Sequence, residues 1–143
     1  MRFLIINGPN LNLLGKREPD IYGTNTYEAL CDLIRQEAAQ HGDHASFFQS
    51  NHEGAIIDMI QEAEGRFDAI VINPGAYTHY SYAIHDALRS IGVPAVEVHI
   101  SDITAREPWR QISVTAPACR SMIAGHGFDG YLEAMELLRG EVC

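Results

Sequence analysis

The chain has 143 residues, of which 46% are hydrophobic, enough to supply a core. A chain of about this length buries roughly 68–70% of its unfolded surface, so it needs no disulfide or metal ion to fold. We therefore expect one domain over residues 1–143. The formal net charge of −9 at pH 7 disfavours non-specific binding to nucleic acids or anionic membranes, because proteins that bind these partners present basic surface.

The cysteines Cys31, Cys119 and Cys143 are odd in number and far apart, which predicts neither a disulfide framework nor a zinc site. The first apolar run, residues 3–6, is too short for a signal peptide. No stretch approaches the roughly 18 apolar residues of a membrane span. We therefore expect a cytoplasmic protein.

Short apolar segments alternate with segments of helical spacing along the chain. The short segments contain β-branched or aromatic residues and predict strands at 3–7, 45–49, 69–73, 95–100 and 121–124. The helical spacing predicts helices near 27–38, 56–63, 81–91 and 130–139. Asn25 with Glu28, and Ser50 with Glu53, have the spacing of capping boxes at the first two helices.

This alternation predicts right-handed crossovers and a parallel sheet covered on both faces. We expect an α/β fold: a flavodoxin-like three-layer sandwich with a five-stranded parallel sheet of order 2-1-3-4-5. Ligands of such sheets bind outside the carboxyl ends of the strands, at the switch point between strands one and three. Asn10, Asn73 and the segment 97–101 follow or end strands one, three and four, so we expect them to converge there.

The connection after the first strand runs from Gly8 to Gly23. It exceeds the roughly 12–15 residues at which a structureless connection becomes uncommon and is usually functional or disordered. Its leucines, isoleucine and tyrosine argue against disorder, so we interpret it as an active-site lid with Arg17 and Tyr22 near its far end. Tyr22, with a usual pKa of about 10, is a poor base unless cations such as Arg17 and Arg110 stabilise its phenolate. The alternative is a tyrosine that anchors the loop to the core.

In strand four, Glu97, His99 and Ser101 alternate with apolar residues, so their side chains point to one side. A carboxylate such as Glu97 can raise the proton affinity of His99 and make it a general acid near neutral pH. The alternative is an edge or solvent-facing strand whose polar face meets water, and this segment alone favours neither.

Two other polar segments are less specific. Asn73-Pro74-Gly75 allows backbone to approach a ligand closely but is also typical of an ordinary turn. His79 in the same loop, taken alone, is better explained as a surface or helix-start histidine. We interpret 51–54 as a helix start and a candidate subunit contact, away from the switch point.

Taken together, these segments resemble the type II 3-dehydroquinate dehydratases, small flavodoxin-like enzymes that convert 3-dehydroquinate to 3-dehydroshikimate. The resemblance runs through almost the whole chain, and several separate motifs occur in the right order. The matching segments are 7–15, Arg17-Glu18-Pro19, Tyr22-Gly23, 51–54, 73–79, Asp86-Ala87-Leu88, 97–101 and Gly130-Tyr131.

The resemblance implies catalytic roles. Tyr22 would be the phenolate base that removes a proton next to the ketone, and Arg17 would keep it ionised and close the lid. Asn10, directly or through a water molecule, would stabilise the enolate. His99, oriented by Glu97, would protonate the departing hydroxyl in an anti elimination that uses no metal and no organic cofactor.

It also implies how the substrate is held. The backbone amides of Ile100 and Ser101 would bind the substrate carboxylate, and Asn73, His79 and Arg110 would bind its ring hydroxyls. Asp86 matches a residue that reaches the neighbouring subunit's site, which implies a homododecamer built as four trimers. The enzyme would serve the shikimate pathway, which leads to chorismate and the aromatic amino acids, or quinate breakdown.

The sequence departs from the family at three positions. Asp102, Thr104 and His85 stand where asparagine, histidine and arginine are usual. None matches a catalytic group, so we expect weaker substrate binding or altered trimer packing before lost chemistry.

Two other functions stay open at this point. The same fold serves flavin- or nucleotide-binding modules, although the first loop is not a glycine-rich phosphate cradle. A metal-dependent hydrolase that uses His79, Glu97 and His99 is also conceivable, because imidazole and carboxylate groups bind zinc.

Overall fold

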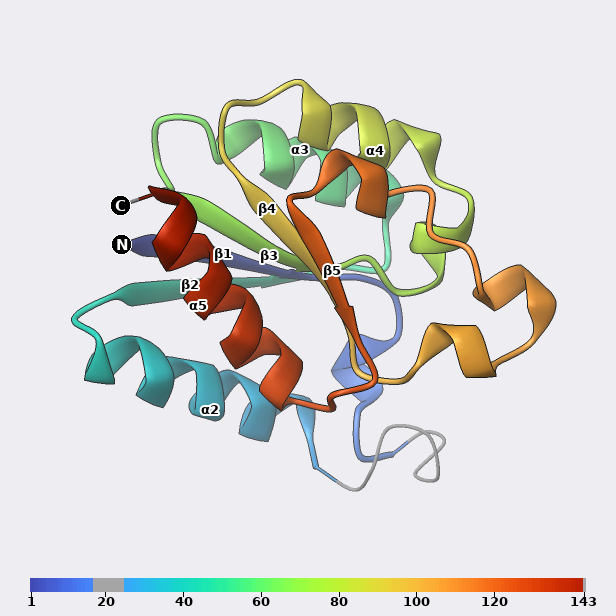
Figure 1. The fold of residues 1–143 in the computed structure, drawn as a ribbon, viewed down its shortest axis with the longest axis horizontal. Helices are drawn as coiled ribbons and strands as arrows, with labels where there is room; N and C mark the ends of the chain where they lie inside the picture. Colours follow the sequence, from blue (N-terminus) through green and yellow to red (C-terminus); the bar gives the residue numbers. More distant parts are fainter. Residues whose placement is uncertain (17–24, 143) are drawn as a thin grey trace.

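The computed structural model describes residues 1–16 and 25–142, and the side chains up to residue 141. Its centre is a parallel sheet in the order 2-1-3-4-5, as predicted (Figure 1). The strands are β1 (Arg2–Asn7), β2 (His44–Gln49), β3 (Ala69–Asn73), β4 (Ala95–His99) and β5 (Ser121–Ala124). Their bounds agree with the predicted strands within one residue, because each strand is a short apolar run between polar or turn residues.

Within the described residues, four α-helices cover the sheet in two layers (Figure 1). Helices α2 (Tyr27–Gln40) and α5 (Asp129–Val142) lie on one face, and α3 (Glu53–Glu62) and α4 (Tyr82–Arg89) lie on the other. Each pair encloses its own group of buried apolar side chains against the sheet. The three-layer sandwich is therefore confirmed. No helix in the described ranges is long and apolar enough to span a bilayer.

Strand β4 lies between β3 and β5, so it is not an edge strand. Val96 and Val98 belong to the core under α2 and α5, whereas Glu97 and His99 point to the other face. Both polar side chains are buried, and Glu97 has no exposed surface. The alternative of a solvent-facing polar strand is therefore wrong.

The two predicted capping boxes are also wrong. Thr26, not Asn25, caps α2, and its hydroxyl accepts a hydrogen bond from the Ala29 amide at 3.1 Å. At α3 the N-cap is His52, without a side-chain bond. Glu53 is the first helical residue, and it accepts a hydrogen bond from the Ser81 hydroxyl at 2.5 Å. Glu53 therefore makes a tertiary contact with Ser81 instead of the local contact with the backbone that a capping box requires.

The loops after β1 and β3 touch each other. The Gly8 amide donates to the carbonyl of Asn73 at 2.8 Å. A Cβ atom at Gly8 would lie 2.2 Å from the carbonyl oxygen of Pro74, which no side chain can do without moving backbone. Glycine at this position brings the ends of the two strands together.

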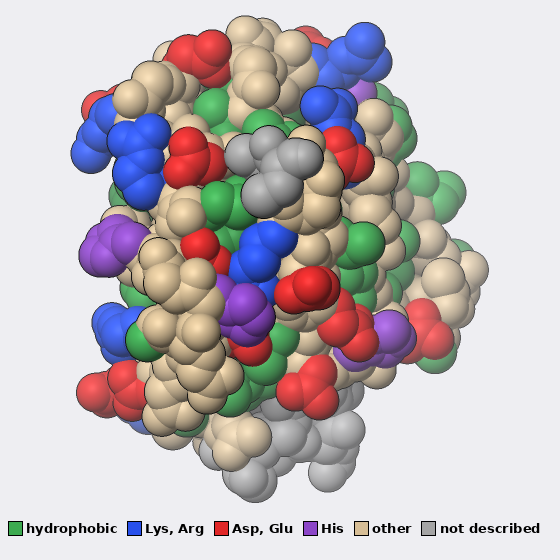
Figure 2. Space-filling view, turned by 60° about the vertical axis from the view of Figure 1, so that its left-hand side comes forward, with side chains coloured by type: hydrophobic (Ala, Val, Ile, Leu, Met, Phe, Trp, Pro, Cys, Tyr) green, Lys and Arg blue, Asp and Glu red, His purple; other side chains and the backbone are tan. Residues whose placement is uncertain are grey.

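The surface carries charges of both signs. On the face shown in Figure 2, basic and acidic side chains stand among one another instead of forming a continuous basic patch. Two ion pairs join α5 to α2 and to the loop that follows it: Arg139 pairs with Glu37 of α2 at 3.2 Å and with Asp43 of the loop at 2.8 Å.

Candidate functional site

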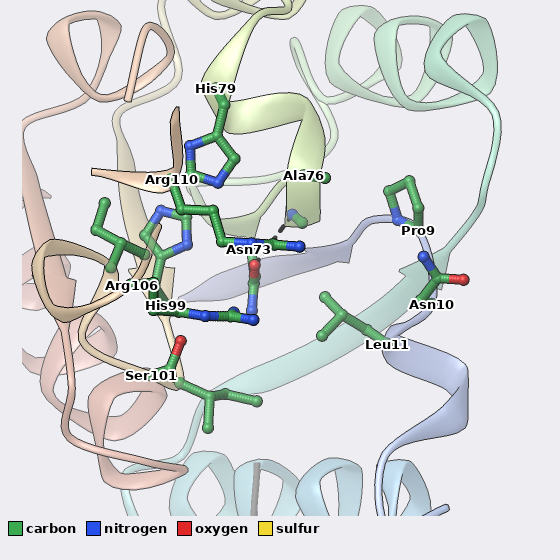
Figure 3. Close-up of a pocket in the computed structure, with 13 residues that line it drawn as sticks. Pro9, Asn10, Leu11, Asn73, Ala76, His79, His99, Ser101, Arg106 and Arg110 are labelled. Carbon is green, nitrogen blue, oxygen red and sulfur yellow. Dashed lines mark hydrogen bonds between the residues drawn. The ribbon is translucent and has the colours of Figure 1, made fainter. Parts of the chain in front are cut away.

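A pocket of ≈ 130 Å³ lies at the carboxyl ends of β1, β3 and β4 (Figure 3). Seven of the candidate site residues surround it: Asn10, Asn73, His79, His99, Ile100, Ser101 and Arg110. The other lining residues are Pro9, Leu11, Gly75, Ala76, Ile103 and Arg106. The parallel sheet brings these segments together because the carboxyl ends of its strands meet at one edge.

His99 ends β4 at this pocket, with only 6% of its surface exposed. Its Nε2 atom lies 2.7 Å from Oε2 of Glu97. The two residues are two positions apart on one strand, so they share a face and the pair forms within β4 itself. Because Nε2 is held by Glu97, Nδ1 is the remaining ring nitrogen for a proton transfer.

The environment of Glu97 favours its charged form. Burial raises the pKa of Glu97, but the hydrogen bond and charge of His99, with hydrogen bonds from Ser113 and Thr115, lower it below its ordinary value. A carboxylate only accepts hydrogen bonds, so His99 Nε2 must donate to it. In this pair, the protonated Nε2 of His99 therefore donates a hydrogen bond to the buried, ionised carboxylate of Glu97.

Asn73 is held rigidly at the end of β3. Its Oδ1 accepts from the Gly75 amide at 3.1 Å, and its Nδ2 donates to the hydroxyl of Tyr131 at 3.1 Å. Tyr131 in turn donates to Oδ1 of Asn7 at 2.6 Å. Burial raises the pKa of Tyr131 far above its ordinary value, so its hydroxyl keeps its proton.

His79 and Arg110 meet around Trp109. The His79 ring stands edge-on to Trp109, with ring centres 5.3 Å apart, and the Arg110 guanidinium lies 4.0 Å above the indole. Nδ1 of His79 donates to the carbonyl of Ile112 at 2.8 Å, which leaves Nε2 as its other polar atom. Glu107 pairs with Nε of Arg110 at 3.0 Å.

Asn51 corrects one interpretation of the sequence. The helix start at α3 is confirmed, but Asn51 is not away from the site. Its Oδ1 accepts from the backbone amide of Asn10 at 3.0 Å, and its carbonyl accepts from the Tyr77 hydroxyl at 2.8 Å. Asn10 has a left-handed backbone with φ of 70°, so this bond supports a conformation that few residues adopt.

Two of the described candidate residues do not line the pocket: Glu97, which lies behind His99 and contacts its ring, and Asp86. Arg17 and Tyr22 lie outside the described residues. Asp86 is on α4, where its side chain is 79% exposed and lies 3.1 Å from Nδ1 of His85. Arg106 also lines the pocket; the sequence indicated it only as one of three arginines in polar stretches that could hold a small anion.

Sequence reasoning also missed the groups that support the site. Thr78, Ser113 and Thr115 surround Glu97, and no local pattern marks them. Two of the departures from the family, Asp102 and Thr104, contact each other. The carboxylate of Asp102 accepts hydrogen bonds from the amide of Thr104 at 3.0 Å and from the hydroxyl of Thr104 at 2.6 Å. These bonds lower the pKa of Asp102, so a negative charge stands next to Ser101.

Fold and pocket together define a flavodoxin-like α/β protein with a polar, mostly pre-formed site for a small molecule at the carboxyl edge of its sheet. The sequence model of the family described as dehydroquinase class II matches residues 1–139. The chain belongs to this family, and it is an enzyme of the hydro-lyase class.

Individual relatives agree with the family. A 3-dehydroquinate dehydratase of Clostridium acetobutylicum is 55% identical over 139 residues, which are 97% of this chain and 96% of the relative. The crystal structure of a type II dehydroquinase from Butyrivibrio crossotus has a TM-score of 0.95 at 53% identity and covers 97% of each chain. A 3-dehydroquinate dehydratase-like protein from Bifidobacterium longum is more distant, with a TM-score of 0.73 at 28% identity over 100% of this chain and 98% of that one.

The alternatives find no support. In residues 8–16, the described part of the first loop, β1 is followed by the short 3-10 turn Leu11–Leu13 and not directly by an α-helix whose amides could hold a phosphate. Within residues 1–16 and 25–142, no group of three or more His, Cys, Asp or Glu side chains has a metal-binding arrangement. Family membership therefore decides against the flavin- or nucleotide-binding module.

Proposed function

We propose that the chain catalyses the dehydration of 3-dehydroquinate to 3-dehydroshikimate by an anti elimination through an enolate. The single observation that carries this proposal is the buried pair of Glu97 and His99, joined at 2.7 Å in the pocket of a class II dehydroquinase. An elimination of water needs an acid for the departing hydroxyl, and a histidine that donates one ring proton to a carboxylate is suited to that task.

The first half of the reaction forms the enolate. Tyr22, as a phenolate kept ionised by Arg17, removes the proton next to the substrate ketone, and the electron pair moves onto the ketone oxygen. Asn10 stabilises the resulting negative charge, directly or through a water molecule. The hydrogen bond from the Asn10 amide to Asn51 supports this role, because it fixes Asn10 before the substrate arrives.

The second half expels water. The electron pair on the enolate oxygen re-forms the ketone, the carbon–carbon double bond forms, and the bond from carbon to the departing hydroxyl breaks. His99 supplies the proton from Nδ1, so the hydroxyl leaves as water. Tyr22 then holds one proton and His99 lacks one. Exchange with solvent restores both, and the enzyme is unchanged overall.

The remaining residues hold the substrate. The backbone amides of Ile100 and Ser101 bind its carboxylate, and Asn73, His79 and Arg110 bind its ring hydroxyls. Their common place around one pocket supports this assignment (Figure 3). Asp86 completes the site of a neighbouring subunit, which its exposure on α4 permits.

We propose the same wider setting that the family resemblance implies. Residues 1–143 act as one catalytic domain with no cofactor, in a cytoplasmic homododecamer of four trimers. The reaction serves the shikimate pathway toward aromatic amino acids, or quinate breakdown. Neither nucleic acid nor membrane is a partner.

The test is a direct assay. Purified protein is mixed with 3-dehydroquinate, and the conjugated enone of the product is followed by its ultraviolet absorbance, with His99→Ala as the matched inactive protein. Steady formation of the enone by the wild type alone supports the proposal. A folded, assembled wild type that forms no product contradicts it.

A further inference from the structure

Three hydroxyl groups surround the carboxylate of Glu97. Thr78, in the 3-10 segment Gly75–His79, lies 2.8 Å from Oε2 of Glu97, and Ser113 lies 2.7 Å from the same oxygen. Thr115 donates to Oε1. The carboxylate is thus contacted from two segments other than its own strand, and it lies where water does not reach it.

The number of protons on the surrounding groups shows how many hydrogen bonds Glu97 can accept. Each hydroxyl has one proton to donate. Ser113 already accepts from the Ala116 amide at 3.0 Å, which directs its own proton toward Glu97. Thr78 Oγ1 also lies 2.7 Å from the hydroxyls of Ser113 and Thr115, so the three hydroxyls contact one another as well as Glu97. With His99 Nε2, up to four donors are available to the two carboxyl oxygens, about as many as an ionised carboxylate can accept. A protonated Glu97 would have to reverse one of these bonds.

Among the described residues, the other titratable groups near Glu97 do not take over this role. Cys119 faces Glu97 from the end of the segment Ala116–Ala118, and burial with the charge of Glu97 raises the pKa of its thiol to about 12, so it is neutral. His79 faces it from the other side, and burial lowers the pKa of that imidazole, so it too is neutral at pH 7. On the neighbouring strands, Ile72 of β3 and Met122 of β5 stand opposite Glu97 and do not titrate.

The arginines of the pocket have an acidic partner of their own. Arg110 pairs with Glu107 at 3.0 Å, and Arg106 approaches the same carboxylate at 3.9 Å. Stabilisation of the Glu97 charge therefore comes from His99 and the three hydroxyls.

We propose that Thr78, Ser113 and Thr115 are positioning residues that decide where the proton of the Glu97–His99 pair resides. This inference rests on the proposed function, in which His99 must hold that proton as the acid. Besides the one N–H of a neutral imidazole, the pair can carry one further proton in two ways: on His99, as an imidazolium beside an ionised Glu97, or on Glu97, beside a neutral His99. Only the first form can protonate the departing hydroxyl, and the three hydroxyls favour it because they donate to the anion.

The consequence of losing one hydroxyl has a definite direction. A less stabilised carboxylate binds protons more tightly, so the pair as a whole releases its proton at higher pH. At the same time, part of the protonated pair has its proton on Glu97, where it is useless for catalysis. The alkaline limb of the kcat profile therefore moves to higher pH, while the maximal kcat falls. A simple packing defect does not produce both changes.

Thr115→Val tests this, because valine keeps the shape of threonine without its hydroxyl, and Thr115→Ser restores the hydroxyl. We expect the valine variant to lose kcat severalfold with KM nearly unchanged, and the alkaline limb of kcat to move up by the logarithm of that loss, about half a pH unit for a loss of about threefold. The serine variant returns both to the wild-type values. Thr26→Val is the control: it removes a helix cap far from Glu97, so it loses stability without a shift of the profile. An unshifted profile in Thr115→Val overturns the proposal.

A second measurement needs no activity. The folded-state pKa of Glu97 is lowered, so its contribution to stability is present above the unfolded value of about 4.3 and is lost as pH falls through the folded value. In Thr115→Val the pKa of Glu97 in the folded state is higher, so as pH falls Glu97 of the variant takes up its proton at a higher pH than in the wild type. The difference in urea midpoint between wild type and variant should therefore narrow from pH 7 to pH 4.

The outcomes separate the two proposals. A difference in midpoint that does not change with pH overturns the role of the hydroxyls, whatever the activity. If the difference narrows but the wild type forms no enone, the proposed function fails and the stabilisation of the Glu97 charge stands.

Discussion

The hydroxyl of Tyr131 donates to Oδ1 of Asn7 at 2.6 Å and accepts from Nδ2 of Asn73 at 3.1 Å. One oxygen of α5 therefore links the carboxyl ends of β1 and β3, the two strands between which the switch point lies. Tyr131 has no exposed surface and does not line the pocket, so it acts on the site through Asn73, the pocket residue that it contacts.

Tyr131→Phe should therefore damage both stability and binding. The change leaves the side chains of Asn7 and Asn73 without their shared partner in a buried place, which costs about 1–3 kcal/mol of unfolding free energy. Asn73 also becomes free to turn, so we expect KM to rise more than kcat falls. Urea unfolding and steady-state kinetics measure the two effects.

Tyr82→Phe is the matched control, because the Tyr82 side chain is 67% exposed. It should change neither quantity. Wild-type stability and KM in Tyr131→Phe would contradict the role assigned to the hydroxyl.

Gly8→Ala should displace the first loop. The new Cβ would lie 2.2 Å from the Pro74 carbonyl oxygen, and backbone cannot give way as a flexible side chain does. We expect a loss of about 1–3 kcal/mol, typical of overpacking, together with reduced kcat, because Asn10 and Asn73 follow the two displaced segments. Thermal unfolding and the enone assay measure these losses.

A second glycine gives the comparison. Gly54 lies within α3 and has open space around it, so Gly54→Ala should stabilise the protein slightly, by about 0.5–1 kcal/mol. If both alanine variants behave alike, the close contact at Gly8 is not what fixes the loop.

The sheet could be predicted because each of its strands is marked by a pattern within its own few residues. Each strand is a short apolar run, and the rules for crossovers then leave few orders for five parallel strands. The pair of Glu97 and His99 was predictable for the same reason, since alternate residues on one strand always share a face. Its burial was not, because it depends on Thr78, Ser113 and Thr115 packing against Glu97 from other segments.

The missed features depend on contacts between distant segments. Thr115 reaches Glu97 only because the chain folds back after β4, and nothing in its own neighbourhood predicts this. Asn51 was placed away from the site because its position after strand two was considered alone. The contact with Asn10 depends on how two loops close over each other, which spacing does not show.

His79 makes the stability of the protein depend on pH. Burial lowers the pKa of His79 below its ordinary value of 6.5, although its hydrogen bond to Ile112 works in the other direction. The unfolded chain then binds a proton more readily than the folded one, so stability falls as pH drops below about 6.5 until the folded value is passed.

His79→Asn removes this titration and can keep a donor for the Ile112 carbonyl. Between pH 7.5 and pH 5.5, at fixed protein concentration, the urea midpoint of the wild type should therefore fall more steeply than that of the variant. Equal slopes would mean that His79 titrates alike in both states.

The two proton transfers can be tested separately by variants of the base and the acid. Tyr22→Phe removes the phenolate, and His99→Gln keeps a polar side chain of similar reach that cannot donate an acidic proton. Each should lower kcat by at least about 100-fold, as general acid–base catalysis commonly contributes, with substrate affinity nearly unchanged.

Exchange of the proton next to the ketone distinguishes the two variants. In deuterated water, His99→Gln can still form the enolate with Tyr22, so it should incorporate deuterium into recovered 3-dehydroquinate faster than it forms product. Tyr22→Phe, which cannot form the enolate, should incorporate none. Exchange by Tyr22→Phe at the rate of His99→Gln would mean that the base is another residue and that the order of proton transfers proposed here is wrong.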